Sequence, residues 1–289
     1  MMTLPHLLFF ILINVIWGSM FIAAKIGLSE FPPVLFTAIR FGILAIVLIP
    51  FMKVPRHQIL PLARIGIVMG VGMYLTLYYS IYLADNTGAI AVVSQLEVPI
   101  AVLLGVLFLG EHFGIRKFAG VAIAFSGALA IGFDPIMFDD LPAVFWMTVS
   151  ATFYATTMYM VRSMERIHPV TITAWLSLIS APVMIVVSLT FETDHWATIT
   201  DASINGWGTL LYTAFFGSVI SHSGMYYLLQ RYPLSLLAPG TLLAPVFSVI
   251  GGIYILGDEM TVRLGIGMLL VLGGVLWLNR RKPEAPATP

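Results

Sequence analysis

Two ionisable residues, Arg40 and Glu97, lie within long apolar stretches of the chain. If both stretches are membrane helices entered from the same side, a rise of 1.5 Å per residue puts both side chains roughly 10–14 Å deep. A charge at that depth costs at least about 2.5 kcal/mol, so it pairs, faces water or is neutralised. The spacing predicts either an Arg40–Glu97 ion pair that staples two helices, or a buried Glu97 carboxylate that binds a substrate amine or a proton, with Arg40 setting its pKa.

Other polar and aromatic side chains gather on helical faces near the same depth. Tyr74, Tyr78 and Tyr82 recur at i, i+4 and i+8, which places them on one stripe of a helix. Tyr82 at the end of its stretch is expected in the interface belt, and a lone histidine such as His222 is more often a neutral hydrogen-bonding group than a proton site. The residues expected to line a shared cavity are Asn14, Trp17, Tyr78, Gln95, Glu97, Tyr154, His222 and Tyr226, with Arg40 as charge partner.

The composition requires a membrane environment for these faces. The chain of 289 residues is 59% hydrophobic and only 10% charged, whereas soluble domains carry about a quarter charged residues. A span needs about 20 apolar residues. Ten candidate spans follow, at 5–25, 33–52, 61–83, 88–109, 116–133, 142–162, 170–190, 205–230, 235–257 and 262–280.

The two halves of the chain repeat one another. Residues 99–127 and 245–274 align from Gly110 onward, and Lys25 corresponds to Arg162. We therefore predict a first unit at 1–134, a second at 141–281 and a disordered cytoplasmic tail at 282–289. Pro99 and Pro245 occupy equivalent places and each removes a helical hydrogen bond, which predicts irregular backbone just before both.

The loop charges predict the orientation. With the N-terminus inside, all of the 14 Lys and Arg residues except Lys25, Arg40 and Arg263 fall in inner connections, and the outer connections are acidic. Both termini are therefore expected in the cytoplasm. Because each half has an odd number of spans, the second half enters the membrane inverted, an arrangement typical of secondary transporters.

Several function classes find no support in the sequence. The chain has no cysteine and lacks metalloprotease, nucleotide-binding and nucleophile-elbow motifs. We expect no enzyme activity, no metal, no cofactor and no nucleic-acid partner, and a driving force drawn from a gradient rather than from ATP. Gly66 and Gly70 form a G-x-x-x-G pair that serves internal packing or, alternatively, a homodimer.

Motifs across almost the whole chain resemble EamA-type members of the drug/metabolite transporter superfamily. They are Trp17-Gly18-Ser19 with Lys25, the Pro32-Pro33 and Arg40-Phe41 pairs, Leu96-Glu97-x-Pro99, Leu109-Gly110-Glu111, and Pro245 with Gly257-Asp258-Glu259, where Asp258 departs from the usual pattern. The resemblance implies an all-α membrane protein of ten helices in two inverted five-helix repeats. It also implies a central cavity lined by the first, third and fourth helices of each half.

The resulting expectation is an inner-membrane exporter of small metabolites, most of all amino acids or their derivatives. It would work by alternating access, with proton coupling through Glu97 as one option and facilitated movement as the other. Carriers of drugs, amines or nucleotide sugars with the same fold remain as alternatives. A membrane-embedded enzyme acting on lipids is a further one, with Asp139-Asp140 and Asp258-Glu259 as its only acidic candidates.

Overall fold

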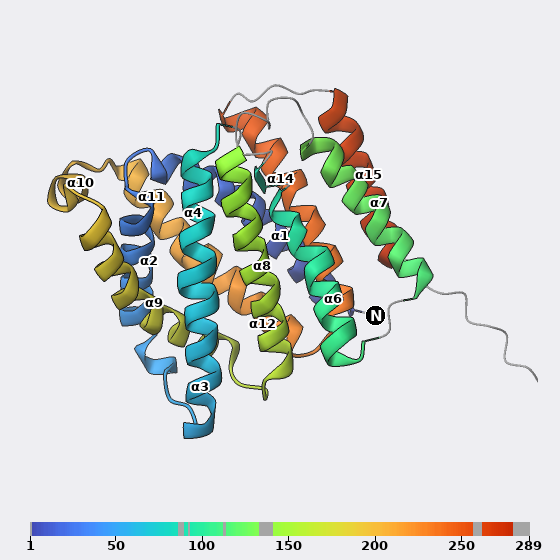
Figure 1. The fold of residues 1–289 in the computed structure, drawn as a ribbon, viewed down its shortest axis with the longest axis horizontal. Helices are drawn as coiled ribbons and strands as arrows, with labels where there is room; N and C mark the ends of the chain where they lie inside the picture. Colours follow the sequence, from blue (N-terminus) through green and yellow to red (C-terminus); the bar gives the residue numbers. More distant parts are fainter. Residues whose placement is uncertain are drawn as a thin grey trace, which may run out of the picture.

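The computed structural model describes residues 2–85, 90, 91, 93–111, 114–132, 141–256 and 262–279 (Figure 1). The predicted junction between the halves, the 282–289 tail and the acidic pairs at 139–140 and 258–259 lie outside these residues. The described part of the first half contains α1 (Leu4–Leu28), α2 (Pro33–Val47), η1 (Ile49–Phe51), α3 (Arg56–Ile65), η2 (Gly66–Met73), α4 (Tyr74–Leu83), η3 (Ser94–Leu96), α6 (Glu97–Leu109) and α7 (Ile115–Gly132).

The second half follows the same plan. Its described elements are α8 (Leu141–Ser163), α9 (Pro169–Phe191), α10 (His195–Asp201), α11 (Ile204–Tyr212), η5 (Thr213–His222), α12 (Ser223–Leu229), α13 (Leu234–Leu237), η6 (Ala238–Leu243), α14 (Ala244–Gly251), η7 (Gly252–Leu256) and α15 (Val262–Asn279). Helical structure thus occupies nearly all of the described part of the predicted spans.

Length and composition suit several of these segments to a bilayer. In the described part of the chain, four continuous helical segments are long and apolar enough to cross a membrane: Leu4–Leu28, Arg56–Leu83, Pro169–Phe191 and Leu234–Ile255. The prediction of an all-α membrane protein is confirmed at this level.

Irregular helical geometry recurs at equivalent places in the two halves. The π-helical segments η2 and η5 precede α4 and α12, and the 3₁₀ segments η3 and η6 precede α6 and α14. The 3₁₀ segments lie immediately before the turns that contain Pro99 and Pro245, as the missing proline N–H groups predict.

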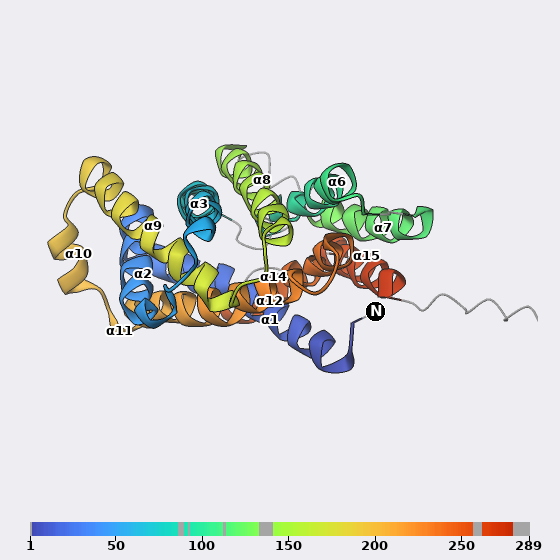
Figure 2. The same cartoon turned by 90° about the horizontal axis from the view of Figure 1, so that it is seen from below.

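Figure 2 shows the helices arranged in two rows. One row consists of α9, α3 with α4, α8, α6 and α7, and the other of α2, α11 with α12, α1, α14 and α15. Direct packing of α2 on α9 and of α7 on α15 joins the rows. Under the sequence repeat, each member of one row corresponds to a member of the other.

One pair of segments that the sequence repeat relates runs in opposite directions. In Figure 1, α3 lies at the lower end of its segment and α4 lies above it, whereas α11 lies at the upper end and α12 below it. The chain therefore ascends through α3 and α4 and descends through α11 and α12.

The G-x-x-x-G pair is used in internal packing. A Cβ atom on Gly66 would lie 2.7 Å from Cβ of Ile179, and one on Gly70 would lie 2.9 Å from Cβ of Ser180. Both contacts are with α9, so these glycines allow the close approach of two helices of the same chain.

Candidate functional site

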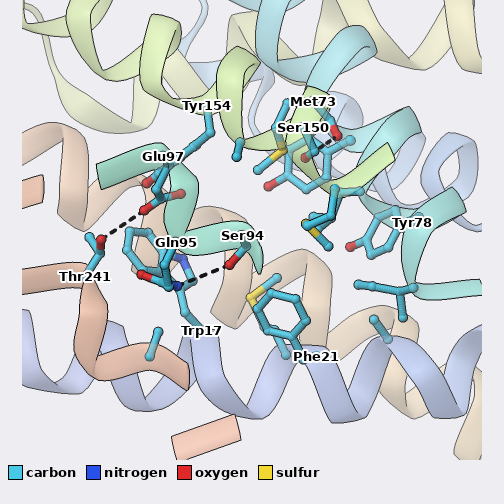
Figure 3. A pocket seen from close by; sticks show the side chains of 18 of the residues that line it. Trp17, Phe21, Met73, Tyr78, Ser94, Gln95, Glu97, Ser150, Tyr154 and Thr241 are labelled. Carbon is cyan, nitrogen blue, oxygen red and sulfur yellow. Dashed lines mark hydrogen bonds between the residues drawn. The ribbon is translucent and has the colours of Figure 1, made fainter. Parts of the chain in front are cut away.

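A cavity of about 80 Å³ lies between the two rows of helices (Figure 3). Both halves of the chain contribute to its wall, from α1, η2, α4, η3, α6, α8, η5, η6 and α14. The polar and aromatic residues of the lining are Trp17, Phe21, Tyr74, Tyr78, Ser94, Gln95, Glu97, Ser150, Tyr154, His222 and Thr241.

Glu97 and Thr241 meet where the two irregular helices approach one another. Glu97 is 9% exposed, and its Oε1 lies 2.9 Å from the Thr241 hydroxyl. That hydroxyl is also 2.7 Å from the carbonyl oxygen of Ala238. Because a hydroxyl carries one proton, Thr241 donates either to an ionised Glu97 or to Ala238. In the second case a protonated Glu97 donates to Thr241.

Aromatic rings form the wall beside Glu97. The ring centroids of Trp17 and Tyr154 are 5.9 Å apart and nearly perpendicular, and His222 lies 5.4 Å from Trp17 and 5.9 Å from Tyr154. The buried Trp17 Nε1, Tyr154 hydroxyl, His222 Nδ1 and Gln95 Oε1 make no hydrogen bond within the protein. Buried polar groups normally have partners, so these four atoms are available to a bound molecule or to water.

Arg40 does not contact Glu97, so the prediction of an Arg40–Glu97 ion pair is wrong. The fully buried guanidinium donates to the Tyr78 hydroxyl, to the Tyr74 hydroxyl at 3.2 Å and to the Ser218 hydroxyl at 2.8 Å. Similar depth does not make two residues neighbours, because α2 packs on α9, α4 and η5 whereas α6 packs on α8, α13 and η6.

The structure brings six of the eight predicted lining residues to the cavity and leaves two outside it. Asn14 donates from Nδ2 to the carbonyl oxygen of Phe10 at 2.8 Å. The Tyr226 hydroxyl lies 2.8 Å from the Met69 sulfur, and its ring stacks on His222 at 6.3 Å. Each follows or precedes a lining residue by one helical turn and forms the layer adjoining the cavity.

Four polar lining residues were absent from the sequence-based set: Tyr74, Ser94, Ser150 and Thr241. Two of them carried a usable signal. Tyr74 belongs to the predicted tyrosine stripe, and Thr241 is the repeat equivalent of Gln95. Ser150 lies in a span rich in hydroxyl side chains, which is a weaker signal, and Ser94 carries no distinguishing pattern.

The Glu111 carboxylate joins several helices at one end of the bundle. Glu111 accepts hydrogen bonds from the backbone N–H groups of Leu234 and Ser235 at 2.8 and 2.7 Å, at the start of α13. Arg162 lies 3.9 Å from Glu111 and donates to the carbonyl oxygen of Leu229 at 3.3 Å. We call this group the Glu111 latch, because it joins the end of α6 to α8, α12 and α13.

Related contacts occur at the opposite end. Lys25, the repeat equivalent of Arg162, donates to the carbonyl oxygens of Ile81 and Ala84 at the end of α4. Glu30 accepts from the Ser203 hydroxyl at 2.7 Å and the Ser203 N–H at 2.6 Å, and these bonds lower the pKa of the Glu30 carboxyl below its ordinary value.

The fold and the cavity together indicate a membrane protein with an internal binding cavity. Four segments are of membrane-spanning length, and the cavity between the rows is open to both halves of the chain rather than confined to one. Among the described residues there is no group of His, Asp and Glu side chains that could hold a metal ion.

The chain belongs to the EamA-like transporter family, which matches residues 4–133 and 141–280. The resemblance found in the sequence is thereby confirmed. The probable amino-acid metabolite efflux pump of Salmonella typhimurium is 26% identical over 280 residues, covering 93% of this chain and 92% of that protein. The pump of the same description from Escherichia coli is 25% identical over 279 residues, covering 93% and 92%. A protein of known crystal structure shares the fold, with a TM-score of 0.76 and 18% identity over 96% of this chain and 97% of that one.

Proposed function

We propose that this protein is a secondary transporter that exports small metabolites, chiefly amino acids or their derivatives, across the inner membrane by alternating access. The observation that carries the proposal is the central cavity, which pairs one carboxylate with unpartnered polar atoms and receives residues from both halves. The efflux-pump descriptions of two relatives along nearly their full length support the direction and the substrate class.

The proposed topology is ten spans in two inverted repeats, 1–134 and 141–281, with both termini and the 282–289 tail in the cytoplasm. Two features support it. Each helix of one row has its repeat equivalent in the other row, and α3 with α4 runs in the opposite direction to α11 with α12 (Figures 1 and 2). The basic residues of the loops supply the orientation.

Inverted repeats give alternating access a simple physical basis, since each half can adopt the arrangement of the other. In the proposed orientation, Ala24, Ile81 and Met147 extend the cavity lining toward the outer ends of α1, α4 and α8. The Glu111 latch lies at the inner end. The proposed state is therefore outward-facing, with the latch holding the inner end closed.

Proton coupling is proposed to run through Glu97. The Thr241 hydroxyl has two acceptors within hydrogen-bond distance, so it can satisfy either protonation state of Glu97 by rotating its single proton. Glu97 could then exchange a proton for a substrate ammonium without leaving an unpaired group in the cavity wall.

Amines without a carboxylate are the second candidate substrates. Glu97 is the only residue with a formal charge among the described lining residues, and aromatic rings stand beside it. A carboxylate next to aromatic faces favours organic cations. Nucleotide sugars are disfavoured, because the described lining contains neither Lys nor Arg for their phosphates.

The proposal is tested by exchange of labelled amino acids in proteoliposomes, with and without an imposed pH gradient, for the wild type and for Glu97→Gln. Coupled export predicts saturable exchange that the gradient accelerates and a Glu97→Gln variant that no longer responds to pH. If Glu97→Gln leaves both the rate and its pH dependence unchanged, the coupling role is wrong.

A further inference from the structure

Arg40 carries a buried charge for which the described residues provide no carboxylate. The side chain is 0% exposed, and the ion pairs within the described part of the chain join other residues, His57 with Glu165 and Arg162 with Glu111. A buried cation without an anion is costly, and Arg40 stays inside only through hydroxyl groups and aromatic faces. A site nearby that accepts an anion would supply the missing charge.

We propose that Arg40 makes the cavity selective for a zwitterion: Tyr74 and Tyr78, polarised by Arg40, donate to the substrate carboxylate while Glu97 receives its ammonium group. This inference rests on the proposed function and specifies how an amino acid is recognised. Arg40 acts as a positioning residue, since the tyrosines stand between it and the cavity.

The two tyrosines are suited to pass the effect of the charge to the cavity. Both line it, and both hydroxyl oxygens accept a hydrogen bond from Arg40. A phenol that accepts from a guanidinium keeps its own proton and becomes a stronger donor through cooperative polarisation. The Arg40 guanidinium also lies 4.5 Å from the ring centroid of Tyr74 and 5.6 Å from that of Tyr78, so both rings are fixed against it.

The opposite end of the cavity offers acceptors. Figure 3 places Glu97, Gln95, Thr241 and Trp17 on one side of the pocket and Tyr78 on the other. Gln95 Oε1 is a buried acceptor without a partner. Glu97 in its ionised form adds a negatively charged acceptor. An ammonium group fits here, because it has three donors and no acceptor.

The charges of the cavity are matched to a molecule that carries both signs. A substrate with only an ammonium group would satisfy Glu97 but would leave Arg40 uncompensated and would feel its repulsion. A substrate with only a carboxylate would be repelled by the ionised Glu97 and would leave that carboxylate without a cation. A free amino acid satisfies both ends, and the unpartnered Trp17 Nε1 beside Gln95 is a donor for a polar group of the substrate.

The test compares three probes of the same shape: L-phenylalanine, 2-phenylethylamine, which lacks the carboxylate, and 3-phenylpropanoate, which lacks the amine. Binding is measured on the purified full-length protein in nanodiscs by competition against a labelled amino acid chosen from a panel of the standard L-amino acids. The proposal predicts that L-phenylalanine competes at least about tenfold more strongly than either analogue.

Two variants separate the proposed role of Arg40 from a structural one. Arg40→Lys keeps the charge but loses the fork geometry, and Tyr78→Phe keeps Arg40 but removes one hydroxyl. Each should weaken L-phenylalanine about tenfold while changing 2-phenylethylamine by less than about twofold. The retained amine binding also reports that the cavity is folded. Glu97→Gln should instead weaken both compounds that carry an amine.

Other outcomes overturn the inference in distinguishable ways. If 2-phenylethylamine competes as well as L-phenylalanine, or if Arg40→Lys weakens both alike, the zwitterion selectivity is wrong and export of amines stands. If no amino acid of the panel binds to the wild type, the proposed amino-acid function fails together with this inference.

Discussion

The Glu111 latch gives the sharpest quantitative prediction. Glu111 uses both carboxylate oxygens, one for the Leu234 N–H and one for the Ser235 N–H, at 2.8 and 2.7 Å. Glu111→Gln preserves the size of the side chain but leaves a single acceptor oxygen and no charge. The variant therefore keeps one of the two backbone bonds in weakened form and loses the attraction to Arg162.

The magnitude follows from these contacts. A hydrogen bond to a charged group contributes about 1.5–3 kcal/mol. The Arg162 contact is 3.9 Å long and the Arg162 side chain is 31% exposed against 10% for Glu111, so it adds at most about 1 kcal/mol. A total loss of about 1.5–4 kcal/mol from the state closed at the latch changes the ratio of closed to open molecules by roughly ten- to a thousandfold.

The absence of cysteine from the chain makes the shift measurable. Ala151→Cys places a single thiol in the cavity wall, where Ala151 is one of the lining residues. In oriented vesicles, a membrane-impermeant maleimide should label this thiol from the outer side in the parent protein. Addition of Glu111→Gln should raise the labelling rate from the inner side at least about tenfold.

Glu192→Gln is the matched control. Glu192 accepts from the N–H groups of Val34 and Leu35, both at 2.8 Å, at the start of α2 and at the opposite end of the bundle. Its replacement should leave labelling from the inner side unchanged. An unchanged rate in the Glu111→Gln variant, or an equal increase in both variants, would refute the assignment of the latch.

Two further predictions concern packing and pH. Gly70→Ala should destabilise the protein by about 1–3 kcal/mol through overpacking against α9, whereas Gly42→Ala, which meets nothing within 4 Å, should not lower the thermal unfolding midpoint in detergent. Hydrogen bonds from His57 and Gln58 lower the pKa of the Glu165 carboxyl below its ordinary value of 4.5. The stability that Glu165 contributes should therefore be constant above that value and be lost as the pH falls through its lowered pKa. The difference in unfolding midpoint between wild type and Glu165→Gln should disappear in acid, and a difference that persists there would contradict the assignment.

Local chemistry predicted much of the fold. Pro99 and Pro245 lack the N–H group that would continue the helix, and the 3₁₀ segments lie where this requires them. The tyrosine stripe placed Tyr78 on the cavity because helical period alone decides which residues share a face. Both inferences depend only on residues close in sequence.

The parts that sequence reasoning missed depend on how helices are arranged around one another. Depth along the membrane normal gave one coordinate of Arg40 and Glu97, but not which helices stand beside α2 and α6. Thr241 escaped notice for the same reason, since its role follows from the approach of η6 to Glu97 across the boundary between the halves. Asn14 shares a helix with Trp17, yet the cavity ends between them.

The most direct test of the account is counterflow of labelled amino acids into proteoliposomes by the wild type and by Ala151→Trp, which fills the cavity from α8. Gly42→Ala serves as the matched control, because it adds a methyl group where nothing lies within 4 Å. The account predicts saturable counterflow of one or more amino acids by the wild type and Gly42→Ala, and loss of it in a folded Ala151→Trp protein. Counterflow that survives Ala151→Trp, or no accumulation of any amino acid by the wild type, would contradict the claim that this cavity carries amino acids across the membrane.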